Sequence, residues 1–160
     1  MKLSNLDVFL TWDDLMTLFD KFTPEGLDIQ DLNPNGESIV INGTKSIIGV
    51  SADWSVCLKP MESADGKCLV FQIESFELEY APLFDVFTKW SRSREANLAR
   101  ICAKKFGEGA SGEDNQLWIN LSAFLSAKTD SNVRIGKVKH FRSGKRGLRL
   151  VIESAKRKGE

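Results

Sequence analysis

The sequence of 160 residues is poor in the residue types from which most catalytic and metal sites are built. It contains one histidine, His140, and three cysteines, Cys57, Cys68 and Cys102, whose spacing matches no common metal site. No serine lies in a nucleophile elbow, so an enzyme would have to rely on carboxylates, which exposed strands commonly carry. We therefore predict a protein that is not an enzyme and that needs no cofactor and no metal.

Long apolar segments are also missing. The longest apolar runs span a few residues, far below the roughly 20 needed to cross a bilayer, so we expect a cytoplasmic protein. Hydrophobic residues make up 42% and charged residues 28%, which is typical of a soluble globular domain. We assign a single domain to residues 1–155 and expect a frayed basic tail at 156–160.

Net charge is zero, but the charges are unevenly distributed. From Lys128 onward there are eleven Lys or Arg and three Asp or Glu, which gives +8, and the remainder carries −8. Ion pairing between two parts of one domain explains this split, and a surface for phosphate or anionic lipid is the alternative. The charge distribution does not predict an oligomeric state.

Two segments, 50–59 and 67–75, alternate apolar and polar residues, which predicts paired antiparallel strands with one buried face. We expect a long loop between them, because Pro60 interrupts the ladder, and this register places Cys57 opposite Cys68 and Trp54 opposite Phe71. A tight turn at 65–66 would shift this register by an even number of residues and keep the same faces.

The first half of the chain predicts one helix among strands. A strand at 3–10 precedes Thr11, which opens the helix because Asp14 follows this hydroxyl cap by three positions. Strands at 28–32 and 37–41 flank a turn at 33–36, and Asn42-Gly43 predicts a hairpin turn. The helix carries an apolar stripe at helical spacing, formed by Leu15, Leu18, Phe19 and Phe22.

The second half predicts further helix and a closing hairpin. The apolar alternation changes phase beyond Ser75, which predicts a β-bulge, and Pro82 suits the first turn of a helix. A helical stripe resumes at Leu98, Ile101 and Cys102. The glycines of 107–112 match the letters of a dinucleotide fingerprint, but they follow a helix, so we interpret them as a helix end. A strand at 117–121 precedes a hairpin of 133–140 with 147–152, turning at 143–146.

These elements predict an α+β fold, in which a curved antiparallel sheet (a meander) carries two main helices on its apolar face. Large aromatic residues on this face indicate either a well-packed core or the lining of an apolar groove. The candidates for ligand binding are Trp54, Phe71, Phe76, Phe84, Phe87 and Trp90.

The closing hairpin is strongly basic. Strict alternation would place Lys137, Lys139 and Phe141 on one face, which resembles a surface that binds nucleic acid, an anionic membrane or a protein. The alternative is an edge hairpin whose charges prevent aggregation. The candidates for anion binding are Lys137, Lys139, Arg142, Lys145, Arg146 and Arg149.

Several short motifs resemble LmeA-like phospholipid-binding proteins. These motifs are the helix opener at 10–15, the strand, loop and strand at 56–60 and 65–67, and the closing segments 133–138 and 147–150. The resemblance implies a long curved sheet around helices with an apolar groove, and it transfers no catalytic residue. It departs from the family in lacking an export signal and in a long basic insertion at 91–110.

We therefore predict a non-enzymatic binding protein that holds a lipid or another apolar molecule between sheet and helices. The alternative function is an interaction module that binds nucleic acid, an anionic membrane or a protein through the basic hairpin.

Overall fold

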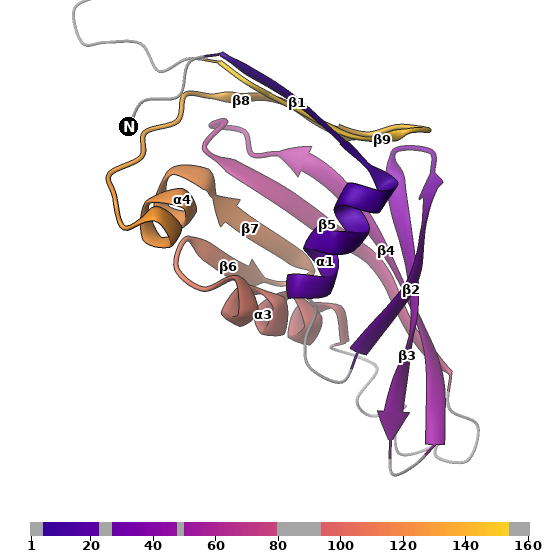
Figure 1. The fold of residues 1–160 in the computed structure, drawn as a ribbon. Coiled ribbons are helices and arrows are strands. Elements are labelled where there is room, and N and C mark those ends of the chain that lie inside the picture. Colours follow the sequence, from indigo (N-terminus) through magenta and orange to yellow (C-terminus); the bar gives the residue numbers. More distant parts are fainter. Residues whose placement is uncertain (1–4, 23–26, 48–49, 80–93, 154–160) are drawn as a thin grey trace, which may run out of the picture.

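The computed structural model describes residues 5–22, 27–47, 50–79 and 94–153 and has an α+β fold (Figure 1). Within these residues, two antiparallel sheets of three and six strands pack with three helices. The strands are β1 (Leu6–Thr11), β2 (Leu27–Asn35), β3 (Ser38–Ile47), β4 (Val50–Glu62), β5 (Cys68–Glu79), β6 (Ala110–Glu113), β7 (Gln116–Asn120), β8 (Val138–Ser143) and β9 (Gly147–Ile152). The helices are α1 (Trp12–Phe22), α3 (Arg94–Phe106) and α4 (Leu121–Thr129).

Helix α1 begins at the predicted cap. The N–H of Asp14 donates to Thr11 Oγ1 at 3.3 Å, and the N–H of Thr11 donates to Asp14 Oδ2 at 3.0 Å. This reciprocal pair is a capping box that satisfies donors left free at the first turn. Leu15 is 2% exposed and Phe19 packs against the core, which confirms part of the predicted stripe, whereas Leu18 is 38% exposed.

The six-stranded sheet has the order β2-β3-β4-β5-β7-β6, so four consecutive strands lie side by side as predicted for a meander. The predicted turn at Asn42-Gly43 is wrong, because both residues lie inside β3. Gly43 pairs with Ile29 of β2 and with Trp54 of β4. A side chain at Gly43 would collide with the main-chain carbonyl of Asp28 and with the ring of Trp54, so the glycine is required by close packing rather than by a turn.

The pairing of β4 with β5 follows the tight-turn register rather than the long-loop register. Glu62 lies opposite Leu69, and Leu58 lies opposite Ile73, so Cys57 does not face Cys68. The long loop predicted from Pro60 is wrong. The ladder between β3 and β4 ends at Leu58, so the missing N–H of Pro60 costs no hydrogen bond to β3.

A β-bulge reverses the phase of β5 near Ser75, as the sequence predicts. Cys57 pairs with Ser75 while Leu58 pairs with Ile73, so Glu74 has no partner across the ladder. The Glu74 carboxylate instead accepts a hydrogen bond from the hydroxyl of Ser38. The extra residue turns Phe76 onto the same buried face as Ile73.

A second sheet, which the sequence did not predict, has the order β1-β9-β8. The closing hairpin forms around 143–146 as predicted, with the N–H of Gly144 donating to the carbonyl of Gly147 at 2.9 Å. The first strand then pairs with the last, Leu6 lying opposite Ile152 and Leu10 opposite Leu148. The prediction of a single continuous meander is therefore wrong, because pairing between distant parts of the chain leaves no local signal in the sequence.

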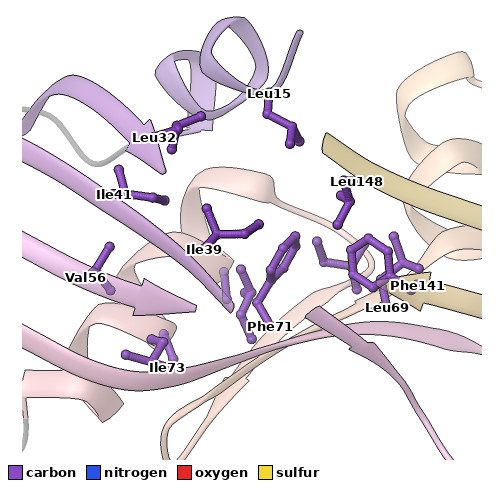
Figure 2. Packing of buried hydrophobic residues seen from close by; sticks show 14 of the residues in the cluster. Leu15, Leu32, Ile39, Ile41, Val56, Leu69, Phe71, Ile73, Phe141 and Leu148 are labelled. Atoms are coloured by element: carbon purple, nitrogen blue, oxygen red, sulfur yellow. The ribbon is translucent and has the colours of Figure 1, made fainter. Parts of the chain in front are cut away.

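The core lies between the inner face of the six-stranded sheet and the elements that cover it. Phe71 on the large sheet meets Phe141 on the small sheet edge to face, with ring centroids 5.3 Å apart. Figure 2 shows these rings beside each other, with Leu148 next to Phe141 and Leu15 of α1 nearby. Helices α1 and α3 both contribute buried residues to this core, and a third helix, α4, follows β7.

Two predicted segments lie outside the described residues. The helix expected from Pro82 falls in the range 80–93, together with Phe84, Phe87 and Trp90. The basic tail expected at 156–160 also lies outside. No helix in the described ranges is long and apolar enough to cross a membrane.

Candidate functional site: an apolar cavity under α3

An apolar cavity of about 80 Å³ lies between the inner face of the six-stranded sheet and helices α1 and α3. Strands β3, β4, β5 and β7 form its floor, and the two helices form its cover. All lining side chains are apolar, if a buried cysteine is counted as a small hydrophobic residue. They are Phe19, Ile41, Trp54, Val56, Leu58, Phe71, Ile73, Phe76, Leu98, Ala99, Cys102, Phe106 and Leu117.

Three aromatic residues of the sheet converge on this cavity. The rings of Trp54 and Phe76 lie 6.4 Å apart between centroids and tilt by 36°, while Phe71 meets Phe19 of α1 edge to face at 6.0 Å. The indole N–H of Trp54 donates to the carbonyl of Thr44 at 2.9 Å. Because this donor is already satisfied, Trp54 adds no unpaired polar group to the cavity.

The cavity exists because small residues of α3 face large residues of the sheet. Ala99 is fully buried and lies against Gly112 of β6, where a side chain would collide with the helix backbone. This close contact holds one side of α3 near the sheet. Ala99 and Cys102 line the same cavity as Trp54 and Phe76, on its opposite side.

The thiol of Cys102 belongs to the wall of the cavity rather than to a reactive site. Burial raises its pKa to about 11, so it stays protonated at neutral pH. Leu98, Cys102 and Phe106 are only partly buried, so this side of the cavity lies close to the protein surface.

The volume limits what the cavity holds in this conformation. Pockets that enclose drug-sized ligands measure about 300–1,000 Å³, and an engineered cavity of about 150 Å³ in another protein binds benzene. A space of about 80 Å³ therefore accepts a group smaller than a benzene ring unless side chains or α3 move.

The six basic candidates of the closing hairpin are divided between paired and free side chains. Arg142 binds Glu62 through two hydrogen bonds of 2.9 and 3.1 Å, and Arg149 binds Asp7 through two of 3.1 and 2.7 Å. Lys139 lies 3.3 Å from Glu153. Within the described ranges, Lys137, Lys145 and Arg146 form no ion pair, and all three are exposed.

The predicted basic face that included Phe141 is wrong. The register between β8 and β9 shifts between Val138 and His140, so Lys139 is a bulge residue that interrupts the alternation. Val138 and Phe141 are therefore both buried, and Phe141 joins the core rather than a phosphate-binding surface.

The structure brings together three of the six predicted aromatic site residues. Trp54, Phe71 and Phe76 are buried on one face and line the cavity, as both the core and the groove interpretations require. Sequence reasoning missed Phe19, which belongs to the apolar stripe of α1. It also missed Phe106, whose signal is its spacing of four residues from Cys102 on α3.

The cysteines form no pair in the structure. Cys57 lies opposite Ser75 and Cys68 opposite Asn120, so the predicted contact between these two thiols is wrong. Burial raises the pKa of both thiols, and nearby carboxylates add to the effect. In the part of the chain that the structure describes, no three His, Cys, Asp or Glu side chains gather closely enough to hold a metal ion.

Comparisons with protein-family models, curated proteins and solved structures gave no significant match to this chain. The resemblance to LmeA-like phospholipid-binding proteins therefore stays a prediction.

Proposed function

We propose that this chain is a non-enzymatic binding protein that takes one apolar group of a lipid or of another small apolar molecule into the cavity under α3. The observation that carries the proposal is the all-apolar wall formed by β3, β4, β5, β7, α1 and α3. A dry apolar cavity loses dispersion contacts that an apolar guest would restore. We also propose that the six-stranded sheet curves around this cavity.

The lining also restricts the chemistry of the ligand. No charged side chain lines the cavity, and the indole N–H of Trp54 is already bonded to Thr44, so a polar head group placed inside would lose its water without compensation. The ligand therefore inserts its apolar end and leaves its polar end at the surface, next to Leu98, Cys102 and Phe106. Insertion of more than a few carbon atoms requires lining side chains or α3 to move.

A cavity-filling substitution tests this proposal. Cys102→Leu replaces a short lining side chain by a longer one, while Ile101→Leu changes the adjacent, 44% exposed position and serves as the matched control. Titration of the full chain with a fluorescent fatty acid measures affinity, and native mass spectrometry after mild extraction detects a co-purifying lipid. We expect Cys102→Leu to weaken binding at least about tenfold and Ile101→Leu to leave it unchanged. No binding by the unmodified chain, or equal binding by both variants, would contradict the proposal.

A second candidate function uses the tip of the closing hairpin. Lys145 and Arg146 are exposed there, and the carbonyl of Lys145 is fixed by a 3.0 Å hydrogen bond from the indole N–H of Trp12. An ordered basic tip can contact the phosphates of a nucleic acid or of an anionic membrane, and such binding weakens steeply as salt rises. Binding to single-stranded DNA or to anionic vesicles at two salt concentrations tests it. If Lys145→Glu with Arg146→Glu leaves all such binding intact, this function is excluded.

A further inference from the structure

Strand β1 ends the three-stranded sheet with an open edge. The sheet order β1-β9-β8 leaves one side of β1 without a neighbouring strand in the described part of the chain (Figure 1). Leu6 is 37% and Phe9 51% exposed, which makes β1 the most exposed apolar strand described. We propose that this edge pairs with β1 of a second copy of the chain and joins the two small sheets into one.

The direction of the main-chain groups on β1 follows from the hairpin hydrogen bond between Gly144 and Gly147. That bond points the carbonyl of Gly147 towards β8, and alternation then points the main-chain groups of Leu148 and Leu150 towards β1. Leu10 and Val8, which lie opposite these two residues, are therefore the β1 residues that bond to β9.

Asp7 and Phe9 consequently direct their main-chain N–H and C=O groups away from β9, towards the open edge. Thr11 has the same orientation, and its N–H is indeed bound by the side chain of Asp14 rather than by β9. In the described ranges, no main-chain partner meets the outward groups of Asp7 and Phe9. Such a row of free donors and acceptors is a template for another strand.

The other three sheet edges carry features that prevent strand addition. Strand β2 contains Pro34 and a bulge at Gln30, and β6 is only four residues long and packs against α3. On β8, Lys139 forms a bulge, and the N–H of Val138 already donates to the carbonyl of Gly66 at 2.8 Å. Strand β1 has no proline and pairs with β9 without a bulge. Because β1 lacks the features that protect the other three edges, its edge is the one suited to pairing with another strand.

A second copy fits this edge through a two-fold axis at Val8. In that register Asp7 of each copy lies opposite Phe9 of the other, so every outward main-chain group of both residues is bonded. A register centred on Asp7 would oppose like charges, and one centred on Phe9 would need the N–H of Thr11, which Asp14 already occupies. The chosen register also covers the exposed ring of Phe9. The pairing is isologous, so it closes as a dimer rather than extending into a fibre.

Mass measurement of the full chain by sedimentation or light scattering over a concentration series tests the inference. We expect a mass of twice 17.9 kDa at high concentration, and 17.9 kDa at all concentrations for Phe9→Lys, which places a charge on the paired edge. The matched control is Ile101→Lys, a similarly exposed apolar position on α3, which should remain dimeric. A monomeric unmodified chain, or a dimer that survives Phe9→Lys, overturns the inference.

Amide hydrogen exchange on the unmodified chain gives a test that does not depend on a variant. The amides of Asp7 and Phe9 face outwards, so in a monomer they exchange rapidly. In the proposed dimer they are slowed at high concentration and recover fast exchange on dilution. Fast exchange of both amides in concentrated samples contradicts the inference, even if the chain forms dimers through another surface.

Discussion

The inner face of the six-stranded sheet is covered in two different ways. Around Phe71, the small sheet contributes Phe141 and Leu148, and the aromatic rings meet edge to face in a filled core (Figure 2). Around Trp54 and Phe76, α3 contributes the short side chains of Ala99 and Cys102 between Leu98 and Phe106, and a cavity remains. Both regions carry bulky apolar residues on the same sheet face, so the cover decides whether the core is solid or hollow.

This difference separates stability from function within one core. A filled region loses both burial and packing when a side chain is shortened, because its neighbours relax only in part. A hollow region tolerates added volume, because the space is already present. The region near Phe141 therefore stabilises the fold, and the region near Cys102 is where the proposed function places the ligand.

The largest expected effect comes from opening the filled region. Phe141 is 2% exposed, so Phe141→Ala removes a buried ring and its contact with Phe71. We expect a loss of about 3–5 kcal/mol in the free energy of unfolding, measured by denaturant titration. A loss below about 1 kcal/mol would show that this region is not tightly packed.

A pair of enlargements compares the two regions directly. Leu148→Phe adds volume where Leu148 is 3% exposed and should cost about 1–3 kcal/mol, as overpacking does. Cys102→Leu adds volume next to the cavity and should change stability by less than about 1 kcal/mol. Thermal unfolding measures the loss of stability in both variants. Equal destabilisation would show that the two regions do not differ in packing.

A smaller effect is expected from the ion pair that ties the two sheets together. Glu62 of β4 binds Arg142 of β8 through two hydrogen bonds, with side chains 25% and 37% exposed. Glu62→Gln keeps the shape of the side chain but removes its charge. Because the pair is partly solvated, we expect a loss of about 0.5–1 kcal/mol, and less at high salt. Denaturant titrations at low and high salt measure both values, and a loss that does not depend on salt argues against an ionic contribution.

The smallest effect concerns the exposed pair of Asp7 and Arg149. The hydrogen bond from Arg149 lowers the pKa of Asp7 below its ordinary value of 3.8. A carboxyl whose folded pKa is lowered stabilises the fold above its unfolded pKa, and this contribution disappears as the pH falls through the folded pKa. Asp7→Asn should therefore lower the melting temperature slightly at pH 7, and this difference should shrink as the pH falls below 3.8 and the carboxyl takes up its proton. A difference that persists unchanged in acid would contradict the charge pairing.

Local signals in the sequence predicted the elements that depend on local chemistry. The capping box of Thr11 and Asp14, the bulge beside Ser75 and the closing hairpin all depend on residues close together in the chain. Errors arose where distant residues decide the outcome. Gly43 resembles a turn residue, but it is required by the ring of Trp54, and Pro60 resembles a strand end, but it lies beyond the last pair with β3.

The cavity could be predicted only in part, for the same reason. Alternation placed Trp54, Phe71 and Phe76 on one buried face, and this prediction is confirmed. Whether such a face is filled depends on the size of the residues across from it. The small residues Ala99 and Cys102 lie on a helix whose position over the sheet no local pattern defines.

The central claim is that the apolar core is hollow under α3 and filled beside β8. Titration with xenon, an apolar probe smaller than benzene, followed by methyl NMR, tests it most directly, because Ile41 and Ile73 line the cavity while Ile152 lies in the small sheet. The account predicts that the methyl resonances of Ile41 and Ile73 shift and saturate, that Ile152 does not respond, and that Cys102→Leu abolishes the shifts. Absence of any shift, or an equal response of all three isoleucines, would contradict it.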